Sequence, residues 1–530
     1  MGVKLEDLLS ENKGPLLEDK SKKTIRLLLT LIAIIAVLIL VFVVLGISNA
    51  QKTAQLERAR ALSTDIDLIS AYIKNVYSEY RATGDSSKMI GVSQEGKYVT
   101  PVVLNVNGHE EEYKYGYYYV TANEIKTMIS TLNIEKENYV LNYSTGDVVN
   151  LVGVKWNGKK YYSVDDLRAI RDGKTPPSDY TIYINTPEDM KNLYKYPNGQ
   201  FKLGKDIDMS AYAVGDGWEP VPEFSGNFEG RGYVIRNLTI SRASQRYCGL
   251  FGQVKNGATI NNLKLENVNV AGGEYTGAIA GTCSGNLLNC SVTGIVSSQS
   301  SNIGGICGLF ENGTLKNVVS KVSVAGAENV GGLIGTITSG TIETSMQEGS
   351  VNGIENVGGF VGRISPLANT VISQVYSNTN IIANEKAGGT VGTLEIQNAS
   401  KLKILDTYAL GKITSCTNTA GGFIGNIVTN PGSEFEFDSV YTVVDTPILC
   451  NTRGGFAGNV VVRGSNIVSR SFWEKDNLLD KDVLSIGQTN NQGIEFESHT
   501  PEEMRDTAVF EGWNVNIWKF EKGNLPTLRW

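Results

Sequence analysis

The 530-residue chain has a formal net charge of −7, so it lacks the basic excess by which proteins hold nucleic acid, and we expect no nucleic-acid partner. It contains two His and six Cys, and the His count excludes a His-rich metal site. The length predicts two or three domains, and 58 glycines concentrate in one half of the chain.

The N-terminal segment predicts a membrane anchor. A basic cluster from Lys20 to Arg26 precedes residues 27–47, which are apolar and carry no charge. About 20 apolar residues in a helix span the hydrocarbon core of a bilayer. The alternative is a cleaved signal peptide ending near Ser48-Asn-Ala50, although the run is long for one. Basic residues stay in the cytoplasm, so we expect a cytoplasmic tail over 1–26, a transmembrane helix over 27–47 and an extracellular location for the remainder, at the cell membrane.

An amphipathic stalk helix is predicted over 48–83. Its apolar residues recur at steps of three or four, which places them on one helical face; they are Leu62, Ile66, Ile69, Ile73, Val76 and Tyr80.

A small α/β head is predicted over 84–172. Strands over 98–106 and 112–120 meet at the Asn107-Gly108 turn, and strands over 138–143 and 148–155 follow. Thr121 and Glu124 form a capping box that opens a helix to about Leu132, and Ser163 caps a last short helix.

An apolar helix that continues into an amphipathic helix and a small α/β head resembles the type IV pilins, and the segments 138–147 and 153–161 are similar to heads of pilin-like proteins from Gram-positive anaerobes. The resemblance covers about 27–172 and implies pilin-like partner subunits. The chain lacks the Gly-Phe junction and the early Glu of pilin precursors, so neither peptidase processing nor assembly into a shaft follows from the resemblance.

After a Pro-rich linker over 173–180, the chain repeats one short phrase, in which two or three small or apolar residues stand between glycines. Eight copies occupy 249–252, 277–281, 304–308, 331–335, 358–362, 388–392, 421–425 and 454–458. Their closing glycines are 29, 27, 27, 27, 30, 33 and 33 residues apart. A steady period of this length is typical of a solenoid, in which stacked repeats supply the core.

Short runs of β-forming residues between turn signals predict strands inside each repeat. The fold class is therefore mainly β: a right-handed β-solenoid of about eight coils, preceded by the transmembrane helix and the α/β head. In the coil from Gly331, we expect turns at Ser339-Gly340, Gly349 and Asn352-Gly353. The phrase glycines are expected to adopt positive φ at corners and to allow close backbone approach between coils.

The phrases resemble the GLUG repeat family of bacterial surface proteins over about 240–460. Segments 186–190, 201–208 and 224–238 are similar to the lead-in of such arrays, and 471–473 and 500–530 to their ending. The resemblance places a lead-in over 181–247, a repeat solenoid over 248–468 and an ending over 469–530. Because the end coils of a solenoid expose unpaired strand edges, we expect an N-terminal cap within the lead-in and a C-terminal cap over 469–530. Thr500 followed by Pro501 predicts a short helix that leads into an aromatic cluster in the second cap. Family members include adhesins and the non-catalytic parts of large secreted peptidases, so the resemblance implies a surface location.

Three groups of residues are candidate sites. Asp206 and Asp208 share one strand face, as carboxylate pairs of polysaccharide-cleaving β-helix enzymes do, or they end a strand before the Ser210 turn. A column of Glu side chains is a candidate Ca²⁺ site, because like charges in register repel and oxygen ligands suit that ion, or it is a solvated corner; the column comprises Glu274, Glu328, Glu355 and Glu385. Cys416 and Cys450 hold near-equivalent positions on neighbouring coils and are a candidate disulfide, whereas the other four Cys are expected to be free thiols.

The catalytic motifs for zinc peptidases, serine hydrolases and nucleotide-binding enzymes do not occur in the sequence. We therefore expect a non-enzymatic, cofactor-free surface protein, a pilin-like adhesin or surface-assembly component, with a glycan, host-surface or cell-wall ligand. The alternatives are a β-helix enzyme acting on polysaccharide and a minor pilin-type component of a filament or secretion machine.

Overall fold

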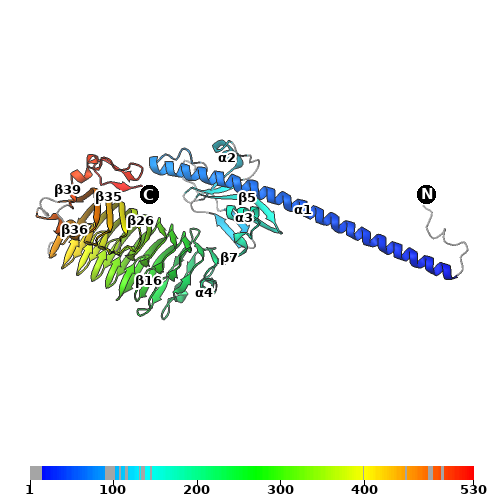
Figure 1. Ribbon diagram of the computed structural model, residues 1–530, viewed down its shortest axis with the longest axis horizontal. Coiled ribbons are helices and arrows are strands. Elements are labelled where there is room, and N and C mark those ends of the chain that lie inside the picture. The colour runs from blue at the N-terminus through cyan, green and yellow to red at the C-terminus, as the bar shows by residue number, and fades with distance from the viewer. Residues whose placement is uncertain are drawn as a thin grey trace. The chain divides into compact units, whose positions relative to one another are not determined.

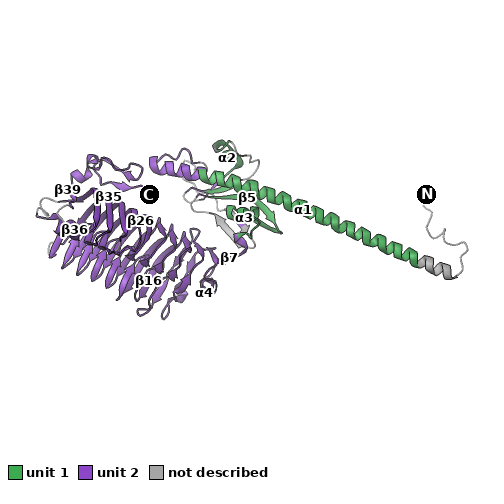
Figure 2. Cartoon of the chain, in the orientation of Figure 1, with its two compact units in different colours: residues 1–71, 120–141, 147–176 green, residues 72–119, 142–146, 177–530 purple. Residues whose placement is uncertain are grey.

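The computed structural model describes residues 15–89, 102–106, 109–113, 117–130, 132, 138–143, 146–397, 399–447, 450–475, 482–490 and 494–529. The chain divides into two compact units (Figure 2). One comprises residues 1–71, 120–141 and 147–176, and the other comprises residues 72–119, 142–146 and 177–530.

A single helix, α1 (Pro15–Thr83), contains both the apolar run and the amphipathic stretch (Figure 1). Its apolar part has a mean hydropathy of 3.5 and none of it is buried, so by length and composition this helix is able to cross a membrane. The helix continues through Ser48-Asn-Ala50 without a break.

The predicted apolar face of the stalk is confirmed for five of its residues. Leu62, Ile66, Ile69, Ile73 and Val76 are all buried. Tyr80 is 37% exposed, so the prediction was wrong for the last position, where a ring with a polar hydroxyl at the end of a helix does not need burial.

The α/β region contains a four-stranded sheet in the order β3 (Tyr117–Val120), β4 (Tyr139–Asn142), β5 (Asp147–Trp156) and β6 (Lys159–Ser163). Strands β5 and β6 are antiparallel across Asn157 and Gly158, which both have positive φ, as a type I′ turn requires. A separate antiparallel pair is formed by β1 (Val102–Val106) and β2 (His109–Tyr113), and the Asn107-Gly108 turn lies outside the described residues.

Both predicted helix caps are present. Thr121 and Glu124 exchange hydrogen bonds in a capping box that opens α2 (Ala122–Met128), which ends earlier than the predicted Leu132. The Ser163 side chain accepts a hydrogen bond from the Asp166 backbone at the start of α3 (Val164–Arg171). The predicted strand over 112–120 is divided between β2 and β3.

Residues beyond Pro177 form a β-solenoid of about nine turns, one more than predicted (Figure 1). The linker contains a short 3₁₀ turn, η2 (Pro177–Asp179). The strands that contain the second half of each phrase form one parallel face: β14 (Phe251–Val254), β17 (Ala280–Cys283), β21 (Cys307–Phe310), β25 (Ile334–Ile337), β28 (Val361–Ile364), β31 (Val391–Ile396), β34 (Ile424–Thr429) and β36 (Thr452–Val461). Two strands outside the phrases extend this face, β10 (Val221–Phe224) at its start and β38 (Leu484–Thr489) at its end.

The strands that precede the phrases form a second parallel stack: β20 (Ser301–Gly304), β24 (Glu328–Gly331), β27 (Glu355–Gly358), β30 (Lys386–Gly388) and β33 (Thr419–Gly421), which then joins β36.

The remaining strands form the other large sheet. Its long strands are β16 (Lys264–Gly272), β19 (Ser291–Ser298), β23 (Val319–Ala325), β26 (Gly340–Asn352), β29 (Thr370–Ile382), β32 (Lys401–Ser415), β35 (Glu434–Asp445) and β37 (Ser465–Glu474). Its short strands are β7 (Thr181–Ile184), β8 (Gln200–Leu203), β9 (Ile207–Asp208), β11 (Asn227–Glu229), β12 (Val234–Arg236), β13 (Thr239–Ser241), β15 (Thr259–Asn261), β18 (Asn286–Leu288), β22 (Thr314–Lys316) and β39 (Glu497–His499).

The register between coils follows the phrase spacing. Ile334 pairs with Val361, Val361 with Val391, and Val391 with Ile424. Phrase side chains such as Leu333, Phe360 and Phe423 are fully buried in one core that extends from Ile184 to Phe496. Because each phrase residue pairs with its equivalent in the next coil, the repeat period of the sequence is the number of residues in one coil.

The phrase glycines allow close approach, but they do not adopt the positive φ that was predicted. A Cβ on Gly332 would lie 2.3 Å from the carbonyl oxygen of Gly359, and one on Gly358 would lie 1.9 Å from that of Val361. Positive φ occurs instead at polar residues one coil apart, such as Asn302 (65°), Asn329 (54°) and Asn356 (53°). Asn tolerates the left-handed region and its amide can bond to an equivalent amide, a combination that Gly lacks.

The corner asparagines form a buried ladder. Asn356 Nδ2 donates to Asn329 Oδ1 (2.9 Å), and Asn329 Nδ2 donates to Asn302 Oδ1 (3.2 Å). Gly349, which was predicted to mark a turn, lies inside β26 with φ of 147°, so it bends a strand rather than ending one.

Each end of the solenoid is covered by aromatic side chains. At the start, Trp218 packs on Tyr194 of α4 (Asn192–Lys195), with 5.2 Å between ring centroids, and α4 follows the 3₁₀ turn η3 (Glu188–Lys191). At the other end, Phe496 stacks on Phe456 of the last complete phrase, 3.7 Å away.

The C-terminal tail packs against the side of the solenoid rather than on its end, where the aromatic cluster was expected. Tyr376, Tyr408 and Tyr441 stack at 5.0 Å intervals on the outer face of β29, β32 and β35. Trp513 and Trp518 pack on this tyrosine stack in a second buried cluster, separate from the main core. The tail contains η5 (Glu503–Arg505), which follows the Thr500 cap as predicted, then η6 (Thr507–Phe510), β40 (Trp518–Lys519) and β41 (Thr527–Leu528). In the lead-in, a further 3₁₀ turn is formed by η4 (Ser210–Tyr212).

Replacing a phrase glycine should destabilise the solenoid through overpacking. For Gly332→Val, we expect a loss on the order of 1–3 kcal/mol in the free energy of unfolding, because the new side chain would overlap the Gly359 carbonyl. Thermal and denaturant unfolding of the full chain measure the loss. Ser350→Val is the matched control, since it adds the same side chain at an exposed strand position, and equal stability of both variants would refute the close-approach assignment.

The tail should depend on one charge-assisted hydrogen bond. Trp518 Nε1 donates to Asp406 Oδ1 (2.8 Å), whereas Trp513 Nε1 is buried without a partner among the described residues. We expect Trp518→Phe to cost about 1.5–3 kcal/mol more than Trp513→Phe, because only the first leaves a carboxylate unsatisfied. Amide hydrogen exchange over 500–529 reports the difference, and an equal loss of protection in the two variants would contradict it.

Candidate functional site

The structure brings the predicted glutamate column into register but supplies partners for its charges. Glu328 pairs directly with Glu355 across the strands β24 and β27. Lys386 Nζ lies 2.6 Å from Glu355 Oε1, Asn418 Nδ2 donates to Glu385 Oε2 (2.9 Å), and Arg246 contacts Glu274 (2.9 Å). Among the described residues no group of three or more metal-ligating side chains occurs. A Ca²⁺ ion on this column stays a prediction, and these partners reduce the repulsion that motivated it.

The two candidate carboxylates near the N-terminal end hold separate structural bonds. Asp206 Oδ2 accepts from Arg236 Nη1 (2.8 Å). Asp208 Oδ1 accepts from the Ser210 hydroxyl (2.6 Å) and the Asn237 amide (2.9 Å), and these bonds lower the pKa of Asp208 to about 2. A glycosidase acid needs a raised pKa, so Asp208 has the properties of a strand-end carboxylate.

Cys416 and Cys450 hold near-equivalent positions on adjacent coils, offset by one residue from the strand register. Their thiols donate to the carbonyls of Thr419 and Thr452, which are themselves register partners. Both are free thiols in the structure, and the neighbouring Cys416 side chain lowers the pKa of Cys450. The disulfide stays a prediction. The other four cysteines are buried free thiols, and burial raises the pKa of Cys283 and Cys290 to about 12.

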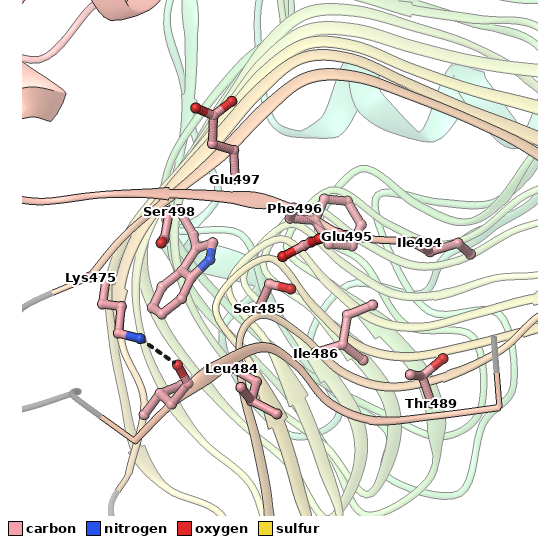
Figure 3. Close-up of a pocket in the computed structure, with 12 residues that line it drawn as sticks. Lys475, Leu484, Ser485, Ile486, Thr489, Ile494, Glu495, Phe496, Glu497 and Ser498 are labelled. Atoms are coloured by element: carbon pink, nitrogen blue, oxygen red, sulfur yellow. Dashed lines mark hydrogen bonds between the residues drawn. The ribbon is translucent and has the colours of Figure 1, made fainter. Parts of the chain in front are cut away.

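A cavity of about 810 Å³ lies at the C-terminal end of the solenoid (Figure 3). Three short segments supply its walls: the end of β37 with Trp473 and Lys475, the strand β38, and residues 494–498. None of these residues belongs to a repeated phrase, so the pattern that revealed the solenoid could not reveal the cavity. The one available signal was that aromatic and charged residues cluster after the last phrase.

Packing against the last phrase fixes the apolar wall of the cavity. A Cβ on Gly455 would lie 2.1 Å from the Trp473 ring, so this glycine makes room for the indole. Lys475 Nζ donates to the Val483 carbonyl (3.0 Å) and lies 5.6 Å from the centre of the Trp473 ring. The ammonium group is therefore held at the wall by a hydrogen bond and a cation–π contact.

No protein-family model matches the chain. Two curated proteins are similar in sequence to part of it. Halomucin of Haloquadratum walsbyi is 34% identical over 194 residues, which is 33% of this chain and 2% of the relative. A putative Gly-rich membrane protein of Evansella cellulosilytica is 34% identical over 120 residues, which is 21% of this chain and 14% of the relative. The chain thus spans a small fraction of the length of these relatives.

Two solved structures are similar in part. A putative immunoglobulin A1 protease from Bacteroides ovatus covers 65% of this chain and 91% of its own, with 18% identity and a TM-score of 0.37. A structure described as IgA1 protease covers 82% of this chain and 31% of its own, with 15% identity and a TM-score of 0.35.

Oxidation should join Cys416 to Cys450. In full-length protein treated with oxidised glutathione, thiol–disulfide exchange transfers the disulfide to this pair and releases reduced glutathione. We expect a stabilisation of about 3 kcal/mol from closing the loop between the two coils. Alkylation followed by peptide mass spectrometry, before and after reduction, detects the bond, and Cys450→Ser is the control. Alkylation of both thiols after oxidation would show that the pair does not close.

Proposed function

We propose that this chain is a membrane-anchored cell-surface protein that presents its β-solenoid for adhesion or surface assembly. The observation that carries the proposal is the covalent order of parts: one exposed apolar helix of membrane-spanning composition, then a folded region, then a long solenoid with a closed core. An anchor at one end and a rigid repeat at the other is an arrangement suited to display.

The anchor supports the membrane part of the proposal. The apolar stretch of α1 has no side chain buried in the protein, and a helix that is apolar all round finds its partner in lipid. The basic residues before it favour a cytoplasmic N-terminus. One partial relative is named as a membrane protein.

The solenoid supports binding over catalysis. The carboxylates that were candidates for polysaccharide cleavage are occupied by structural hydrogen bonds, and Asp208 is held ionised. Extended parallel faces with regularly spaced side chains are the surfaces that repeat proteins use for recognition. A β-helix enzyme is the alternative, and it would need acid–base residues that neither aspartate provides.

A minor pilin-type component is the second candidate function. The supporting observation is that the apolar helix continues without a break into a helix with one buried face, followed by a small four-stranded sheet with capped helices. In this case pilin-like subunits would be partners of α1, and the solenoid would be the displayed part.

Topology labelling tests the proposal. In a chain in which Cys450→Ser removes the one native thiol that is partly exposed, we introduce Ser350→Cys on the exposed face of β26 or Asn12→Cys in the N-terminal tail, and treat intact cells with a membrane-impermeant maleimide. The S350C protein should be labelled in intact cells and the N12C protein only after permeabilisation. The reverse pattern, or a mature chain that begins at Gln51 in N-terminal sequencing, would overturn the anchored, outward-facing arrangement.

A further inference from the structure

We propose that the cavity at the C-terminal end of the solenoid is a saccharide-binding site. This inference rests on the proposed surface-binding function and names the ligand class and the place where it binds. The cavity volume of about 810 Å³ lies within the range of roughly 300–1,000 Å³ that is usual for small-molecule sites.

Several polar side chains face the cavity. Glu495, Ser485 and Ser498 line it and have no hydrogen-bonding partner in the described part of the chain. Figure 3 shows the Glu495 carboxylate and the Ser485 hydroxyl directed toward the same space. A carboxylate is a strong acceptor for hydroxyl donors, and a sugar presents several hydroxyls close together.

Glu495 differs from the carboxylates along the coils. Several of those carboxylates pair with a cation on the adjacent rung, as Glu434 does with Lys401 (2.9 Å) and Glu436 with Lys403 (2.6 Å). Glu495 follows the last complete coil, where no further rung supplies such a cation. Its carboxylate is therefore available to a ligand.

The opposite requirement of a saccharide, an apolar surface for its C–H faces, is also met. Leu484, which is 67% exposed, supplies apolar surface at the cavity, whereas Trp473, Phe496, Ile486 and Ile494 line it as side chains that are themselves buried in the core. Convergent polar groups on an apolar wall are the usual composition of a small-molecule site.

Other ligand classes fit the lining less well. An anion would meet the carboxylates of Glu495 and Glu497, and the ammonium of Lys475 is already bonded to Val483. A metal ion lacks three convergent ligands among the described residues. An extended peptide added to the outer edge of β38, which pairs with β36 in the described sheet, is a different class of partner and is an outcome of the test.

The full chain, purified in detergent, is applied to an array of defined oligosaccharides and to a matched array of extended peptides. We expect retention on oligosaccharides, and the affinity for the retained glycans should fall about tenfold for Glu495→Gln and severalfold for Ser485→Ala, because each removes one hydrogen bond to the ligand. Glu511→Gln is the matched control, since Glu511 is exposed and lies outside the cavity, and its binding should equal that of the unmodified chain.

Retention on peptides alone, no retention on either array, or glycan binding that E495Q and S485A leave unchanged would each overturn the saccharide site. Thermal melting of each variant shows that a loss of binding is not a loss of fold. The topology labelling tests the proposed function separately. If Ser350→Cys is labelled in intact cells but no glycan is retained, the saccharide site is wrong and the surface-display proposal stands. If Ser350→Cys is labelled only after permeabilisation, the surface-display proposal is wrong.

Discussion

The solenoid depends on the close approach of successive backbones at the phrase glycines. A Cβ on Gly331, Gly358, Gly388 or Gly421 would lie about 2 Å from a carbonyl oxygen of its own phrase, and the same atom would also meet the next coil. The absence of that atom lets the chain reverse inside a coil while Leu333, Phe360 and Phe423 fill the interior in a continuous column. Close packing of this kind tolerates little added volume.

Stacking in register imposes a second constraint, because each side chain lies next to the equivalent side chain of the neighbouring coil and must interact favourably with it. Side chains that bind their own kind meet this requirement. Amides form the Asn302–Asn329–Asn356 ladder, and phenol rings form the Tyr376–Tyr408–Tyr441 stack. Like charges repel, and at several outer positions the chain places opposite charges on neighbouring coils, as in Lys316 with Glu343 and Lys321 with Glu348; Glu328 opposite Glu355 is an exception. The low charge density of the repeats and the frequency of Asn have this common origin.

The features that recur in every coil were accessible from the sequence. The phrase spacing predicted the pairing register, and the apolar phrase residues predicted the core. Equivalent positions in successive coils have the same surroundings, so the same residue types recur there. The corners were not predicted: the positive φ at Asn302 and Asn329 looks in sequence like ordinary turn composition, and only the structure shows that the amide both tolerates the conformation and bonds to the next coil. The path of the tail could not be derived either, since Trp518 bonds to Asp406, 112 residues earlier, through a contact that no local pattern encodes.

The end of the stack explains why the cavity lies where it does. Within the coils many polar groups have a partner on the neighbouring coil, and a ligand would have to displace it. After the last phrase, Phe496 closes the core by stacking on Phe456, but the flanking residues have no next coil to match. Glu495 and Ser485 therefore keep their hydrogen-bonding capacity beside a sealed apolar wall. In a repeat fold, residues after the last coil are free to change, because no following coil has to match them. Side chains suited to binding a ligand are therefore expected at the end of the stack.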